Sequence, residues 1–167
     1  ERISPQGGSI RVMAQKKGGI IKRDDSVDEL IALESKLGLD KAETLHKLNH
    51  KISQVRDKLH NLIHSLKADG KSIAGFGAPT KATTLMAHFG LDATVLDFIV
   101  DDNPLKQGLF TPITHIPVLS ADALYKIKPD YVLILAWNFA EPIMQMHKKY
   151  SEQVGQFILP MPNPEIV

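Results

Sequence analysis

The chain has 167 residues, a formal net charge of +1, and 43% hydrophobic and 23% charged residues. This length suits one domain, or one domain with an appendage, and can bury a sizeable core. The small net charge gives no global field to recruit nucleic acid or an anionic membrane, so we expect neither as a partner. No apolar run reaches the roughly 20 residues of a membrane span.

The chain has no cysteine, which excludes disulfides, thiol catalysis and cysteine metal sites. This composition suits a reducing cytoplasm, where we expect the protein to be located. No signal peptide is visible, and the chain opens at Glu1 without a methionine. We therefore expect a fragment of a longer protein.

The first 22 residues predict one strand. Ile10, Val12 and Ala14 alternate with polar or long side chains, and Gly18-Gly19 ends the pattern. Little in the neighbouring sequence would pair with this strand. We interpret residues 1–22 as the end of a preceding domain whose other strands lie outside the chain.

Residues 23–70 predict a helical arm. Ser26-Val27-Asp28-Glu29 has the pattern of a capping box, and Gly38 suits the end of that helix. Asp40-Lys41-Ala42-Glu43 indicates a second start, and the helix that follows runs to Gly70. Its apolar residues repeat alternately every three and four positions, and we call them the seam: Leu45, Leu48, Ile52, Val55, Leu59, Leu62 and Leu66. Because the seam covers only about three heptads, packing back on a sheet is favoured over a free coiled coil.

Two histidine pairs lie beside the seam. His46/His50 and His60/His64 have the i, i+4 spacing that can chelate a metal ion. No acidic pattern completes such a site. The interpretation we favour is a solvated helix flank, with no metal.

From residue 71 onward, strand patterns alternate with helix patterns. Such alternation implies right-handed βαβ crossovers and a parallel sheet. We predict an α/β fold, a Rossmann-like parallel sheet with flanking helices, preceded by the N-terminal strand and the long helical arm. The predicted strands are 72–77, 95–100, 131–135 and 157–159, and the predicted helices are 81–89, 120–127 and 142–150, with a loop at 103–119.

Ligands of open parallel sheets bind beyond the carboxyl ends of the strands. Glycines allow close approach of the backbone, and the helix start offers free N–H groups and a positive dipole end. Lys81 adds a cation, so a phosphate is the expected ligand. The alternative is a tight turn without a ligand, since Thr80 replaces the third glycine of a dinucleotide fingerprint. The residues of this first strand end are Gly75, Gly77, Ala78, Pro79, Thr80 and Lys81.

The second strand end carries Asp101, Asp102 and Asn103, followed by Lys106 and His115 in the long loop. An acidic residue there can accept hydrogen bonds from a ribose or sugar hydroxyl. An Asx-type turn before a proline explains the same pattern, and both interpretations stay open.

The third strand end carries Trp137 and Asn138, just past a buried strand. The tryptophan, the only one in the chain, could stack on a base or could cap the core. We include both residues among the candidates for substrate binding. No nucleophile elbow or HExxH pattern is present, and no catalytic residue is assigned.

Four motifs follow one another along the chain: GFGAPTK at 75–81, FIVDDNPLKQG at 98–108, THIPV at 114–118 and PDYVLILAWNF at 129–139. In this order they resemble the C-terminal domain of SAM-dependent C-methyltransferases, including those that methylate nucleotide-linked keto-sugars. The GGSIR stretch at 7–11 is similar to the last strand of the preceding methyltransferase domain, although Gln6 stands where that family often has histidine.

This resemblance implies a domain that holds a nucleotide-sugar substrate, residues 71–167. It also implies that the S-adenosylmethionine site and the catalytic Tyr-Asp-Glu-His stretch lie upstream, in an N-terminal methyltransferase domain missing here. The fragment alone would then be inactive. Two alternatives remain: an NAD(P)-dependent Rossmann oxidoreductase domain, and a non-enzymatic interaction module built on the helical arm.

Overall fold

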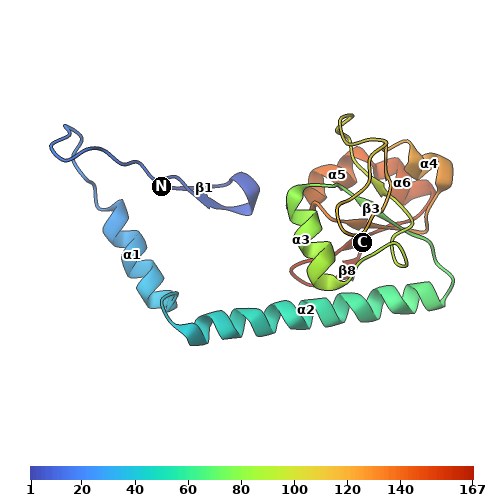
Figure 1. Ribbon diagram of the computed structural model, residues 1–167, viewed down its shortest axis with the longest axis horizontal. Coiled ribbons are helices and arrows are strands. Elements are labelled where there is room, and N and C mark those ends of the chain that lie inside the picture. Colours follow the sequence, from blue (N-terminus) through green and yellow to red (C-terminus); the bar gives the residue numbers. More distant parts are fainter. The chain divides into compact units, whose positions relative to one another are not determined.

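The computed structural model describes residues 1–167, apart from the side chain of Gln6. The glutamine at position 6, where the resembled family often has histidine, therefore lies outside the described side chains. The chain forms two compact units, Glu1–Ile52 and Ser53–Val167 (Figure 1). None of the described helices is long and apolar enough to cross a membrane.

The C-terminal unit is built on one six-stranded sheet. Five strands are parallel, and only β8 at one edge runs antiparallel. The chain winds outward from β3 in one direction and then returns to build the other half, which gives the doubly wound order. This arrangement confirms the predicted α/β, Rossmann-like fold. Across the sheet the order is β5 (Val118–Leu119), β4 (Ile99–Val100), β3 (Ile73–Phe76), β6 (Tyr131–Ile134), β7 (Gln156–Leu159) and β8 (Glu165–Ile166).

Helices cover both faces of this sheet, which is why its strands are apolar on both sides. One apolar cluster joins Ile73 to α3 (Thr80–Phe89) and to the C-terminal half of α2 (Ala42–Ala68). The other joins Ala74, which points to the opposite face, to three short helices. These are α4 (Ala123–Ile127), α5 (Ala140–Met146) and α6 (Lys148–Gln153).

The seam of α2 is only half packed, so the expectation that it packs as a whole is wrong. Leu59 and Leu66 are buried, and Val55 and Leu62 pack against the same cluster. The three remaining positions are exposed by 37–58%: Leu45, Leu48 and Ile52. The physical reason is length, since 27 residues of helix span about 40 Å. A four-residue strand spans only about 13 Å, so a single sheet cannot cover the whole helix.

The N-terminal unit contains α1 (Ser26–Leu37) and a small hairpin. In the hairpin, β1 (Arg2–Ile3) pairs antiparallel with β2 (Ser9–Ile10). The predicted strand is thus shortened and finds its partner within the chain, while Val12 and Met13 stay 80% and 81% exposed. None of the described side chains of α1 is buried.

The ends of α1 test two local predictions. Gly38 ends the helix in a left-handed conformation with φ 64°, as predicted. The capping box is wrong: Asp25 is the N-cap residue and makes no side-chain capping bond. Asp24 instead accepts hydrogen bonds from the backbone N–H and hydroxyl of Ser26. The hydroxyl of Ser26 is therefore used by the Asp24 carboxylate and does not cap the helix.

Several predicted boundaries in the C-terminal unit are also wrong. The strand predicted at 95–100 shrinks to β4, because Asp92 accepts hydrogen bonds from Thr94 and holds the preceding residues in a turn. The helix predicted at 142–150 is divided at His147, and the N-cap position of α4 is Asp122 rather than Ser120, without a side-chain capping bond. Two-residue strands such as β5 and β8 are too short to show a period in the sequence.

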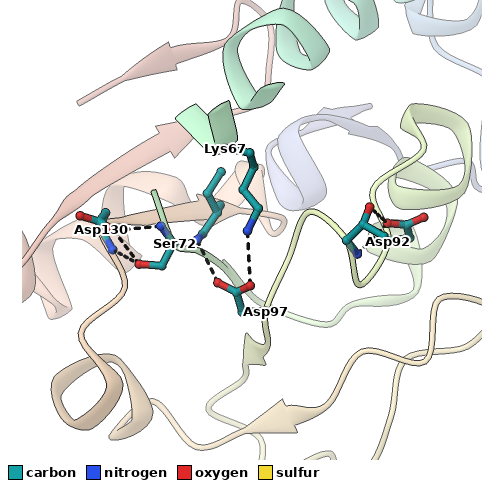
Figure 2. A network of polar contacts seen from close by, with 7 residues as sticks. Lys67, Ser72, Asp92, Asp97 and Asp130 are labelled. Atoms are coloured by element: carbon teal, nitrogen blue, oxygen red, sulfur yellow. Dashed lines mark hydrogen bonds and ion pairs between the residues drawn. The ribbon is translucent and has the colours of Figure 1, made fainter. Parts of the chain in front are cut away.

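Carboxylates fasten the amino-terminal edge of the sheet (Figure 2). Asp130 accepts hydrogen bonds from the Ser72 backbone N–H at 2.9 Å and from its hydroxyl at 2.7 Å. Asp97 accepts one from the Ile73 N–H at 3.2 Å and pairs with Lys67 at 3.3 Å. The Ser72 hydrogen bonds lower the pKa of Asp130 from 3.8 to about 2.

Leu59→Ala should lower the free energy of unfolding by about 2–5 kcal/mol, because it leaves a cavity in a closed core. The matched change Leu48→Ala, in the exposed half of the same helix, should cost less than about 0.5 kcal/mol. Urea unfolding followed by Trp137 fluorescence measures both. Equal costs for the two variants would contradict the division of the seam.

Asp130→Asn should lower the free energy of unfolding at pH 7 by about 1 kcal/mol, a small value because the side chain is 41% exposed. The pKa of Asp130 is depressed on folding, so its contribution is present above about pH 4 and is lost as the pH falls toward 2. The difference between wild type and variant should therefore shrink over that range. Asp69→Asn, at the exposed end of α2, is the control. A difference that stays constant down to pH 2 would show that Asp130 does not act through its charge.

Candidate functional site

The carboxyl ends of β3, β4 and β6 meet at one edge of the sheet, because β3 pairs in parallel with both neighbours. This edge is also where the strand order reverses, between β3 and β6. Ligands of doubly wound sheets bind at such a point. The structure therefore brings the three strand ends chosen from the sequence to one edge.

Gly77 is required by the turn that follows β3. Its φ is +89°, and a Cβ there would lie 2.7 Å from the Ala136 Cβ. Its N–H donates to the Val100 carbonyl at 2.7 Å, so it serves the sheet rather than a ligand. Gly75 is a packing glycine inside β3, where a Cβ would lie 2.8 Å from Ile99 and 2.9 Å from Leu135.

The N–H groups that remain available lie at the start of α3. The Ala78 N–H already donates to Asp101, and Pro79 has none and occupies the N-cap position. Thr80 and Lys81 open the helix, where backbone N–H groups have no partner within the helix. Together with the helix dipole they favour an anion.

Lys81 places its ammonium at the same helix start. Its Nζ is buried and, among the described residues, has no hydrogen-bond partner. The Nζ lies 4.9 Å from the ring centroid of Trp137 and 5.4 Å from that of Phe139. Aromatic faces stabilise a cation but accept no strong hydrogen bonds. An ammonium held in this way has its donors available for an anionic ligand.

Asp101 is 7% exposed, and its carboxylate is fully engaged. It accepts hydrogen bonds from the N–H groups of Ala78 at 2.7 Å and Asn103 at 2.9 Å, and pairs with Lys106 at 3.0 Å. Burial raises the pKa of Asp101, but these hydrogen bonds and the Lys106 charge outweigh it and lower the pKa overall. The Asx-type turn is thus present, and the carboxylate proposed from the sequence for a sugar hydroxyl has protein partners instead.

The other residues chosen from the sequence are Asp102, His115, Trp137 and Asn138. Asp102 is exposed, and His115 is exposed and stacks on Phe110 with ring centroids 4.4 Å apart. Trp137 packs partly on the core cluster, which is one of the two roles left open by the sequence. It also faces Lys81, and its stacking on a base stays a prediction. Asn138 is half-buried and has a partner of its own.

The histidines beside the seam are exposed, as predicted for a solvated flank, except for His60. The His60 ring is half-buried and makes a hydrogen bond with the Phe89 carbonyl at the end of α3, and it contacts His64 edge-on. His60 therefore helps to hold α2 against α3. The described residues contain no group of three or more His, Cys, Asp or Glu side chains that could hold a metal ion.

Some site residues were missed by sequence reasoning. Phe110 gave no signal, because an isolated aromatic residue outside a motif has many structural uses. Phe139 ends the fourth motif, but it was not chosen as a site residue. His147 is 6% exposed and its Nδ1 lies 3.1 Å from the Tyr125 hydroxyl, while its Nε2 is buried without a partner among the described residues. Burial lowers the pKa of His147, and the charge of Asp102 opposes this shift.

A hollow of about 190 Å³ lies between α3 and the loop that leads into β5. Most of its lining is apolar, with two threonine hydroxyls and one lysine ammonium. We call it the β4-side hollow, and its lining residues are Ala78, Pro79, Ala82, Thr83, Met86, Lys106, Leu109, Phe110, Thr111, Pro112 and Val118.

Comparison with known proteins identifies the family of the chain. Residues 4–162 match the family described as the C-methyltransferase C-terminal domain. The chain belongs to this family. It is also 36% identical over 161 residues to the C-methyltransferase NovU of Streptomyces niveus. That alignment covers 96% of this chain and 38% of NovU, so the chain spans less than half the length of this relative.

Within this C-methyltransferase C-terminal domain, Gly77→Ala should destabilise more than Gly108→Ala. Both glycines have positive φ, +89° and +80°, so either alanine strains the backbone by about 1–2 kcal/mol. Only at Gly77 does the new Cβ also meet Ala136, which adds about 1–3 kcal/mol of overpacking. Thermal unfolding of the two variants measures the difference. Equal shifts would mean that Ala136 gives way and that the turn is not crowded.

Proposed function

We propose that residues 71–167 form the substrate-binding domain of an S-adenosylmethionine-dependent C-methyltransferase that methylates a carbon next to a ketone in a nucleotide-linked sugar. Family membership supports the methyltransferase part of this proposal. The single observation that carries the substrate part is the buried, unpartnered ammonium of Lys81 at the start of α3. This ammonium and the two open N–H groups suit the diphosphate of a nucleotide-sugar.

The same edge does not suit S-adenosylmethionine. That molecule carries a sulfonium cation, whereas the unpaired charge here is itself a cation. Asp101, the buried carboxylate at the end of β4, is held by Ala78, Asn103 and Lys106 and is not open to its ribose. We therefore propose that the methyl donor binds in the upstream part of the full-length enzyme. The contribution of this chain is to hold the acceptor so that its carbon faces the methyl group, which is a positioning task.

We further propose that the upstream methyltransferase domain covers the exposed apolar residues of the unit Glu1–Ile52. This unit contains residues 1–22, which we interpret as the end of that domain, and the first part of the helical arm predicted at residues 23–70. Ile20 and Ile21 are 98% and 72% exposed, and a large exposed apolar set is typical of an interaction surface. The length that NovU has beyond the alignment supports a further domain as the partner. We place the enzyme in the cytoplasm, in keeping with its lack of cysteine.

The exposed half of the seam favours a second candidate function, a helical interaction module. Leu45, Leu48 and Ile52 could pair with a second copy of the chain. Sedimentation at rising concentration distinguishes the two. A dimer that Leu48→Lys dissociates, together with no nucleotide binding, would favour the interaction module.

Lys81→Ala should weaken nucleoside diphosphate binding by about 1.5–3 kcal/mol, the value of a hydrogen bond to a charged group. Stability should not fall, because the buried ammonium makes no hydrogen bond in the free protein. Calorimetric titration of the chain with uridine diphosphate measures the affinity, and Lys149→Ala, an exposed lysine, is the control. In the same experiment S-adenosylmethionine and NAD should not bind.

Unchanged diphosphate affinity in Lys81→Ala would remove the main support for this site. Binding of NAD in preference to the diphosphate would favour the oxidoreductase alternative. Methyl transfer to a keto-sugar by residues 1–167 alone would contradict the proposal that the methyl donor binds in the upstream part of the enzyme.

A further inference from the structure

The β4-side hollow adjoins the proposed diphosphate site. Pro79 and Thr83 line it, and Thr80 and Lys81 belong to the same first turn of α3. A ligand bound by phosphate at Lys81 would thus have the hollow within reach. At about 190 Å³ it is smaller than the roughly 300–1,000 Å³ of a complete ligand pocket. Its size suits one ring system, as part of a larger ligand.

The outer wall of the hollow is fixed by backbone hydrogen bonds. The Gly108 N–H donates to the Val118 carbonyl, and the Val118 N–H donates to the Leu109 carbonyl, both at 2.8 Å. Farther along, the Thr111 N–H donates to the Ile116 carbonyl at 2.9 Å. The loop is therefore held as a short ladder rather than as a free segment. A preformed wall reduces the ordering cost of binding.

The lining chemistry suits a planar, uncharged ring. Phe110 is 55% exposed, and one face of its ring is covered by His115 at an interplanar angle of 3°. This stack gives the hollow an aromatic wall that is already supported from behind. Thr83 offers a hydroxyl, and Lys106 offers an ammonium that is shared with Asp101 at 3.0 Å. A few polar groups in an apolar lining orient a ring without demanding a charge on it.

The two sides of Lys81 differ in a way that assigns the ends of the ligand. On the β6 side, where the strand order reverses, Trp137 and Phe139 flank the ammonium. The reacting part of a ligand belongs at this reversal point. The part that only anchors belongs on the β4 side, in the hollow.

We infer that the β4-side hollow binds the nucleobase of the nucleotide-sugar, with the base against Phe110 and the sugar directed toward Trp137. This inference rests on the proposed function, since it assigns the base end of the same substrate. It assigns to Phe110 and Thr83 a binding role that none of the sequence motifs indicated.

The test compares ligands with and without a base. Thr83→Trp should fill the hollow and raise the dissociation constant of uridine diphosphate and of adenosine diphosphate about tenfold or more, the range expected when base stacking is lost. Binding of inorganic pyrophosphate, which has no base, should not change. Thr84→Trp is the matched control, because the next residue on α3 is exposed and does not line the hollow. It should leave all three affinities unchanged.

Phe110→Ala is the second variant. Because the Phe110 side chain is 55% exposed, its removal should leave the protein folded. It should also weaken the two nucleotides and spare pyrophosphate. If both variants bind the nucleotides as wild type does, while Lys81→Ala still weakens them, the base lies elsewhere and only this inference is wrong. If wild type binds pyrophosphate as tightly as the nucleotides, the hollow takes no base. If wild type binds none of the three, the proposed function fails as well.

Discussion

The site depends on one buried carboxylate, Asp101. It accepts a hydrogen bond from the turn after β3, through Ala78, and another from the turn after β4, through Asn103. A single side chain thereby fixes two strand ends relative to each other. Lys106 neutralises it at 3.0 Å, so the buried charge is paired and hydrogen-bonded, as burial requires. With this clamp in place, α3 starts in a fixed position and its N–H groups are directed at the edge of the sheet.

The two lysines of this edge illustrate the difference between a structural and a binding charge. Lys106 has a carboxylate partner in the free protein, whereas Lys81 has only aromatic rings nearby. An ammonium with unmade hydrogen bonds is an unfavourable state that a bound anion relieves. Lys106 thus holds the loop, and Lys81 is the cation that we propose binds a ligand.

The sequence predicted the fold well where patterns are long and poorly where they are short. The apolar run of β6 and the glycine turn after β3 carry their own signals, so the doubly wound sheet and the edge that holds the site followed from them. β5 was missed because two residues show no period. The role of Asp101 was left open, because an Asx turn and a sugar-binding carboxylate share one sequence pattern. Whether Leu48 is covered depends on a partner surface, which periodicity alone does not reveal.

The two edges of the sheet differ in how completely their polar groups are satisfied. At the amino edge, Asp130 and Asp97 are matched by N–H, hydroxyl and ammonium donors from the chain itself (Figure 2). At the carboxyl edge, Lys81 Nζ is left without a hydrogen-bond partner among the described residues. Unsatisfied groups cost stability, so a fold tolerates them where they serve a function. The hydrogen bonds of the amino edge can offset the cost of the unsatisfied Lys81 ammonium, because both edges belong to the same strands. Ser72 directly precedes β3, and Lys81 follows β3 after one turn.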